Sequence, residues 1–276
     1  MSEIPSQRWE QPFNFAPGHW KRQLPAKYLA IAARSDVAAL QQLIDAHPDF
    51  LSKRGPHNRT LLWEATRKGK LAAVRWLVEA GADLDATGCY NSESMVQLTP
   101  YCAAVYYRRT AVADYLRSRN PQFDIFRAAF LGDRARVERM LADSPELLNA
   151  EDPHDHEIYC VPLISFAVVG GHFDLTLALI KRGATLGPYS AQLLHLAAKA
   201  SRMDLVELLI SNGADARAVD SGIFVAASDL RILRYLLDHG ASATRPGKNR
   251  MSPLDYVRRG DKGKHPEKVK LLLEYK

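Results

Sequence analysis

The chain has 276 residues, which is long for one compact core and short for three domains, so one or two domains or one elongated array are expected. With 47% hydrophobic and 25% charged residues it is neither disordered throughout nor collagen-like, and no apolar run approaches the roughly 18 residues of a membrane span. The formal net charge of +6 lies entirely in residues 245–276, so the first 244 residues carry no net charge.

The first 25 residues contain Trp9, Phe13, Phe15 and Trp20, which is unusually aromatic for a disordered tail. We therefore treat residues 1–25 as a separate segment that docks on the rest of the chain. The favoured interpretation is a cap that covers the apolar face of the structure beginning at residue 26. The alternative is an arm that binds a partner. Charged residues in this segment interrupt any secretory signal, so the expected location is cytoplasmic.

The rest of the chain repeats a pattern of two short apolar helices. The clearest copy runs from Leu194 to Asp215: a helix with an Ala-Ala pair, a second helix that ends in aliphatic residues, and then Gly213-Ala214. The second aliphatic residue of the closing pair recurs from Ile44 to Leu273 at a mean interval of about 33 residues. Helices of about ten residues cannot bury their apolar faces alone, so the units must stack, and the Ala-Ala pairs permit close packing.

This period resembles that of the ankyrin repeat, with Thr99-Pro100 and Ser252-Pro253 opening helices and glycines of Gly-Ala pairs closing them. The resemblance covers roughly residues 26–275 and implies an all-α solenoid of stacked helix-turn-helix units, forming one domain over residues 26–276. The short connections and abundant arginine favour a bacterial origin. About eight units can be counted, at residues 26–58, 59–97, 98–124, 125–160, 161–191, 192–221, 222–249 and 250–276.

Two intervals between units are longer than the mean, and they predict two long finger loops, at residues 86–98 and 151–161. Tyr90 and Asn91 are candidate binding residues on the first loop. The second carries His154 and His156.

Two imidazoles and three carboxylates within residues 152–157 offer ligands for a divalent metal. However, a His-x-His in a loop lacks the rigid helical spacing of a hydrolytic zinc site, and turn-forming residues of these types are common in finger loops. His154 and His156 are therefore assigned to a finger surface. No metal or cofactor is predicted, and a metal-dependent hydrolase at this loop is the least favoured interpretation.

The family resemblance implies a concave binding surface lined by the pair of residues that follows the small residues of each first helix. The chemistry of these pairs changes from cationic to aromatic to aliphatic and back to one cation, which suits a protein partner. Phe130 and Leu131 could instead pack against the neighbouring fingers, and one of the two adjacent tyrosines could be in the core. The predicted partner-binding residues are Arg67, Lys68, Tyr106, Tyr107, Phe130, Leu131, Val169 and Lys199.

No nucleophile elbow, phosphate loop or dinucleotide fingerprint is present, so the sequence predicts a non-enzymatic protein-binding module that sequesters, inhibits or bridges a partner. The three cysteines, Cys89, Cys102 and Cys160, form neither a disulfide framework nor a metal-binding spacing. The second interpretation is nucleic-acid or anion binding by the basic C-terminal unit. A polar capping unit is favoured over it because stacking aromatics are scarce there. The basic residues concerned are Arg258, Arg259, Lys262, Lys264, Lys268 and Lys270.

Overall fold

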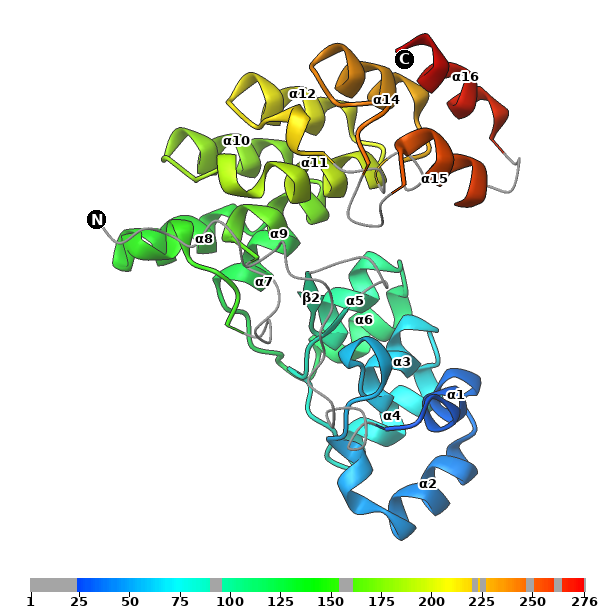
Figure 1. Ribbon diagram of the computed structural model, residues 1–276. Coiled ribbons are helices and arrows are strands. Elements are labelled where there is room, and N and C mark those ends of the chain that lie inside the picture. Colours follow the sequence, from blue (N-terminus) through cyan, green and yellow to red (C-terminus); the bar gives the residue numbers. More distant parts are fainter. Residues whose placement is uncertain are drawn as a thin grey trace. The chain divides into compact units, whose positions relative to one another are not determined.

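The computed structural model describes residues 24–89, 96–153, 161–219, 223, 227–246, 251–260 and 265–275. These residues fall into two compact units (Figure 1). The N-terminal unit comprises residues 24–131 together with 152, 153 and 161, and the C-terminal unit comprises residues 132–151 and the described part of 162–275. The predicted single domain over residues 26–276 stays a prediction.

The N-terminal unit is built from consecutive helix pairs. The first helices of the pairs form one row, in which α3 packs on both α1 and α5 and α5 contacts α7, while α2, α4 and α6 form a second row. Its elements are α1 (Ala26–Arg34), α2 (Val37–Ala46), η3 (Pro48–Leu51), η4 (Pro56–Asn58), α3 (Leu61–Arg67), α4 (Leu71–Glu79), β1 (Gly88–Cys89), β2 (Gln97–Leu98), α5 (Pro100–Tyr106), α6 (Thr110–Arg117) and α7 (Ile125–Leu131).

The C-terminal unit repeats this arrangement. Helix α11 packs on α9 and on its own partner α12, while α10, α12 and α14 form the second row and α15 pairs with α16. Its elements are α8 (Arg134–Asp143), η5 (Pro145–Asn149), α9 (Leu163–Gly170), α10 (Phe173–Lys181), η6 (Gly187–Tyr189), α11 (Ser190–Lys199), α12 (Met203–Ser211), η7 (Ala216–Ala218), α14 (Leu230–Asp238), α15 (Pro253–Gly260) and α16 (Pro266–Glu274).

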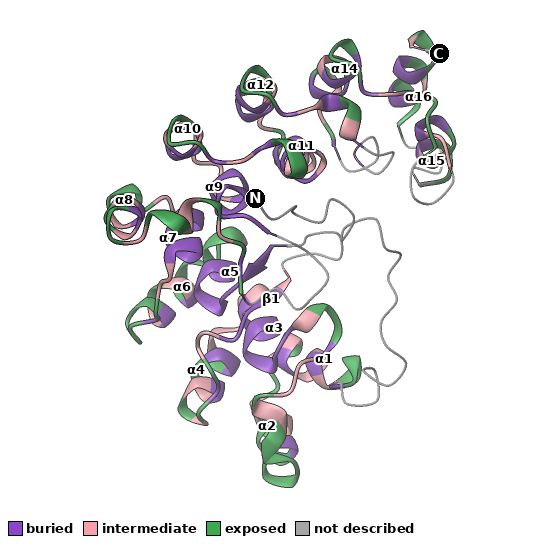
Figure 2. Cartoon of the chain, turned by 60° about the vertical axis from the view of Figure 1, so that its left-hand side comes forward, coloured by how far each residue is buried: buried purple, intermediate pink, exposed green. Residues whose placement is uncertain are grey.

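The first helices of the pairs, which we call the inner helices, supply most of the core. Six consecutive residues of α3, from Leu61 to Thr66, are buried, and all of α9 except its terminal Gly170 is buried as well. Figure 2 shows these helices as almost wholly buried, whereas outer helices such as α4 and α10 bury one side and expose the other. Helices of seven to ten residues are marginal alone, so stacking supplies their stability, as the repeat pattern predicts. The predicted all-α solenoid of stacked helix pairs is confirmed.

The predicted start and stop signals are confirmed. The hydroxyl of Thr99 accepts a hydrogen bond from the backbone of Cys102, and that of Ser252 accepts one from Asp255. These bonds satisfy amide groups that the first turn of a helix leaves without partners. The four glycines that follow α4, α10, α12 and α14 have φ between 93° and 99°, in the left-handed region that glycine enters without a Cβ clash: Gly81, Gly183, Gly213 and Gly240.

Two glycines separate the cost of a left-handed backbone from the cost of a clash. Gly132 has φ 73°, and a Cβ there would lie 2.5 Å from Cε1 of His172, whereas Gly81 has φ 93° and open space around it. We expect Gly81→Ala to lower the free energy of unfolding by about 1 kcal/mol and Gly132→Ala by about 2–3 kcal/mol. Urea denaturation of the two variants compares them directly, and equal losses would contradict the proposed clash.

Leu24, the first residue that the structure describes, belongs to the core. Its side chain is fully buried and its amide donates to the carbonyl of Arg54 at 2.9 Å. Trp9, Phe13, Phe15 and Trp20 lie outside the described residues, so the cap and the arm both stay predictions.

Candidate protein-binding surface

The five predicted pairs are residues 67–68, 106–107, 130–131, 169–170 and 199–200. The structure gives them one common position at the C-terminal ends of the inner helices. In each case the pair is followed directly by a residue with a left-handed backbone. These residues are Gly69 (φ 69°), Arg108 (φ 54°), Gly132 (φ 73°), Gly171 (φ 76°) and Ser201 (φ 54°). The sequence alignment of the pairs therefore corresponds to one repeated turn.

Exposure differs sharply among these equivalent positions. Phe130 is 3% exposed and Val169 is 9% exposed, so both side chains belong to the core and do not offer a binding surface. Leu131 and Lys199 are half-buried. Packing within the stack explains the difference, because an apolar side chain at this position turns inward where a neighbouring element covers it.

At the turns after α3 and α5 the same position is accessible. Tyr106 is 38% exposed, Lys68 and Arg108 are exposed, and Arg67 and Tyr107 are half-buried. The turns after α3 and α5 lie side by side, since Nε of Arg109 donates to the carbonyl of Arg67 at 3.0 Å. We call the surface formed by Arg67, Lys68, Tyr106, Tyr107 and Arg108 the tyrosine–cation patch.

The two tyrosines are joined to each other and to the core. Their ring centroids are 5.1 Å apart in an edge-to-face arrangement, and Tyr107 makes a second edge contact with Trp63 at 6.3 Å. Partial burial raises the pKa of both hydroxyls above the usual value for tyrosine. The rings are thus held in place before any partner binds, which limits the entropy lost on binding.

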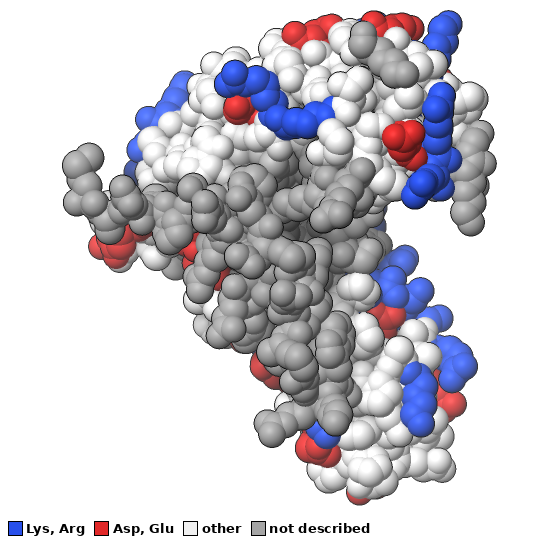
Figure 3. Space-filling model, in the orientation of Figure 1, with Lys and Arg blue, Asp and Glu red and all other residues white. Residues whose placement is uncertain are grey.

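Charge at this surface is unbalanced. Residues 64–70 and 105–109 contain five basic residues and one acid, Glu64. Glu64 is buried and already paired, because Nε of Arg67 donates to it at 2.9 Å and Nη1 of Arg59 lies 3.6 Å away. This hydrogen bond raises the pKa of Arg67. Figure 3 shows basic side chains gathered along the right-hand edge of the N-terminal unit.

The two finger loops have ordered stems. In the first, Gly88 and Cys89 pair in antiparallel fashion with Leu98 and Gln97. In the second, Glu151 and Pro162 form an antiparallel bridge. The predicted loop residues Tyr90, Asn91, His154 and His156 lie outside the described residues, so their roles stay predictions.

A buried arginine that the sequence analysis overlooked holds the two stems. Arg127 of α7 has a side chain only 2% exposed, and it donates to both carboxylate oxygens of Asp152 at 2.9 and 3.1 Å. It also donates to the carbonyl of Gln97 at 3.2 Å and to Asp124 at 3.0 Å. One guanidinium therefore joins residues from both finger stems within the N-terminal unit.

A signal for this role was present in the sequence. Arg127 lies five residues before its left-handed turn residue, where Phe166 and Leu196 provide buried apolar side chains in other repeats. A charge at an apolar core position requires a partner, and Asp124 and Asp152 are available.

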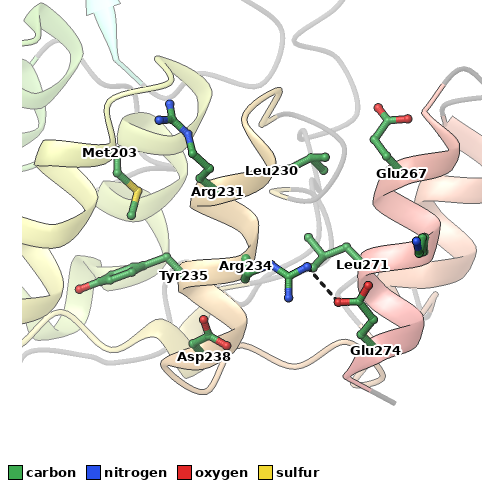
Figure 4. Close-up of a pocket in the computed structure, with 10 residues that line it drawn as sticks. Met203, Leu230, Arg231, Arg234, Tyr235, Asp238, Glu267, Leu271 and Glu274 are labelled. Atoms are coloured by element: carbon green, nitrogen blue, oxygen red, sulfur yellow. Dashed lines mark hydrogen bonds and ion pairs between the residues drawn. The ribbon is translucent and has the colours of Figure 1, made fainter.

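The C-terminal unit contains a cavity of about 410 Å³ lined by residues of α12, α14 and α16 (Figure 4). Met203, Leu230, Tyr235 and Leu271 supply apolar walls. The rim carries three basic and three acidic side chains, and Arg234 is paired with Glu274 at 2.9 Å. A balanced rim gives no electrostatic preference for an ionic ligand.

The basic C-terminal residues do not form one exposed row. Lys268 is 3% exposed, while Arg258, Arg259 and Lys270 are exposed. Lys262 and Lys264 lie outside the described residues. Within the ranges that the structure describes, no group of three His, Cys, Asp or Glu side chains could hold a metal, and no helix is long and apolar enough to cross a bilayer.

Cys102 is expected to be chemically inert in the folded protein. It is fully buried, and burial raises the pKa of its thiol to about 12. At pH 8 the reactive thiolate would be a fraction of about 10⁻⁴, so a Cys89→Ser/Cys160→Ser variant should react with a thiol reagent only after unfolding. Labelling in the presence and absence of denaturant tests this, and rapid labelling of the folded variant would contradict it.

Comparison with known proteins identifies repeats in both units. Residues 57–89 and 193–221 match the ankyrin repeat family model. The human ASB11 ankyrin repeat domain is 20% identical, with 90% of this chain and 97% of that chain covered and a TM-score of 0.30. The ankyrin repeat domain of Bcl-3 is 18% identical, with 76% and 97% covered and a TM-score of 0.34.

No curated protein sequence matches this chain. The two family matches fall in the second and sixth predicted units. The count of eight repeats and the bacterial origin stay predictions.

Proposed function

Because the chain contains ankyrin repeats, which generally act as protein–protein interaction modules, we propose that it binds a partner protein without catalysing a reaction. The tyrosine–cation patch is the proposed contact surface of the N-terminal unit. Leu131 and Lys199, both half-buried, occupy the equivalent turns of α7 and α11 and are proposed as secondary contacts. We place this activity in the cytoplasm, where the chain would sequester, inhibit or bridge its partner.

The observation that carries this proposal is the exposure of Tyr106. Tyrosine and arginine are enriched at binding hot spots, and an apolar centre with a charged rim is the usual anatomy of an interface. Tyr106 and its helix neighbour Val105 are two of the three large hydrophobic residues that are exposed among the described residues. Burying this pair against a partner would remove apolar surface from water.

The test is affinity capture from an extract of the source cells with the wild-type protein and a Tyr106→Ala/Tyr107→Ala variant. We expect the variant to lose partners that the wild type retains. Phe130 is left unchanged because it is buried, so its replacement would damage the fold. Arg139→Ala, at an exposed position of α8 in the other unit, serves as the control. Identical sets of captured proteins from the double variant and the wild type would contradict the proposal.

The basic C-terminal unit gives less support to nucleic-acid or anion binding. Lys268 is buried, and Tyr256 and Tyr275 are both half-buried, which leaves little aromatic surface for stacking on bases.

A further inference from the structure

We propose that the tyrosine–cation patch recognises an acidic segment of a partner protein that carries a large apolar side chain. This inference rests on the proposed protein-binding function and specifies the chemistry of the partner. The occupant follows from three features of the patch: its unbalanced charge, its exposed apolar side chains and the backbone of Arg108.

The charge of the patch selects an acidic partner. Glu64 is the one acid in the two adjoining turns, and it is already engaged by Arg67 and Arg59. Lys68 and Arg108 are exposed, and neither forms an ion pair with any described residue. A partner carboxylate could therefore pair with either cation without displacing a salt bridge between described residues.

The backbone of Arg108 supports a role outside the fold. It lies at φ 54°, as does Ser201 in the turn after α11, whereas the equivalent positions in the turns after α3, α7 and α9 are glycines. An L-residue is disfavoured in this region and glycine is not, so stability alone would favour glycine here. The guanidinium of Arg108 makes no hydrogen bond with the described residues that would offset the cost. An unfavourable backbone that displays an exposed cation is expected where the side chain serves binding.

The aromatic geometry favours a protein over a nucleic acid. Val105 is 39% exposed beside Tyr106, and an aliphatic side chain gives a base no polar contact while it readily packs on a Leu or Phe. Tyr107 already packs against both Tyr106 and Trp63, in edge contacts at 86° and 90°. Two rings fixed nearly at right angles do not form the parallel platform on which successive bases stack.

Selection from a random 12-residue phage-displayed peptide library on the full chain tests the inference. We expect the enriched peptides to combine several Asp or Glu with at least one large apolar residue. Fluorescence anisotropy measures the affinity for the best peptide. Arg108→Gly should lower this affinity about fivefold, and added salt should lower the affinity of the wild type. The same variant should raise the melting temperature by about 2–4 °C, because glycine relieves the backbone.

Ser201→Gly is the matched control, since Ser201 occupies the same left-handed turn position at φ 54° in the C-terminal unit. It should change stability without changing the affinity for the peptide. The inference is overturned if the enriched peptides are neutral or basic. It is also overturned if no peptide is enriched more strongly on the wild type than on the Tyr106→Ala/Tyr107→Ala variant, or if Arg108→Gly leaves the affinity for the peptide unchanged. It is also overturned if the oligonucleotide dT12 binds the patch more tightly than the best peptide. Should any of these occur while cellular capture still depends on Tyr106 and Tyr107, protein binding stands and the acidic partner is wrong.

Discussion

Asp152→Ala is expected to lower the free energy of unfolding of the N-terminal unit by about 3 kcal/mol. The side chains of Arg127 and Asp152 are 2% and 1% exposed, so removing the carboxylate leaves a buried guanidinium without its main partner. Removing one partner of a buried ion pair typically costs about 3–5 kcal/mol of stability. We place this variant at the lower end because Asp124 and the Gln97 carbonyl still contact Arg127. Urea denaturation followed by circular dichroism measures the loss.

Two comparisons isolate the buried charge as the cause. The exposed ion pair between Arg134 and Glu138 provides the first comparison. Exposed pairs contribute little to stability, so Glu138→Ala should leave the urea midpoint almost unchanged. The second is the double replacement Arg127→Met/Asp152→Leu, which removes both charges and should recover most of the loss. If the double variant is less stable than Asp152→Ala, desolvation of an unpaired arginine is not the source of the effect.

Trp63→Ala is expected to lower the free energy of unfolding by about 3–5 kcal/mol, or the melting temperature by roughly 10 °C. Trp63 is fully buried in α3, and its indole nitrogen donates to the carbonyl of Leu98 at 2.7 Å. The guanidinium of Arg59 lies over the ring, 4.7 Å from its centroid. The substitution therefore creates a cavity and also leaves the β2 carbonyl without this donor.

Trp63→Phe separates packing from hydrogen bonding. It keeps much of the buried apolar volume and removes the indole donor, so we expect about half of the alanine effect. Differential scanning calorimetry of the two variants and the wild type measures both shifts. A melting temperature of Trp63→Ala within 2 °C of the wild type would show that this ring does not support the stack.

Trp63 and Arg127 connect the stability of the N-terminal unit to the predicted binding elements, which are the patch and the fingers. Trp63 contacts Tyr107 of the patch and donates to the β2 strand, while Arg127 joins the stems of both fingers. Each side chain is fixed by contacts with more than one element. A substitution at either position should therefore disturb binding through the position of neighbouring groups, whereas Arg108→Gly should affect binding without loss of stability.

The sequence by itself determined the repeated architecture. A period near 33 residues, paired apolar helices, capping hydroxyls and closing glycines all depend on local backbone preferences, and these act within a few residues of one another. For this reason the helix starts at Thr99 and Ser252, the left-handed Gly81 and the common register of the five pairs could be located in advance.

The tertiary structure alone decided which of these equivalent positions reach solvent. Tyr106 and Phe130 hold the same place in their turns, yet one is 38% exposed and the other 3%. Likewise, Arg127 holds a core position because Asp152, 25 residues away in sequence, meets it with a carboxylate. Burial and charge pairing depend on which groups a neighbouring element brings into contact, and that information is not contained in the local pattern of a single repeat.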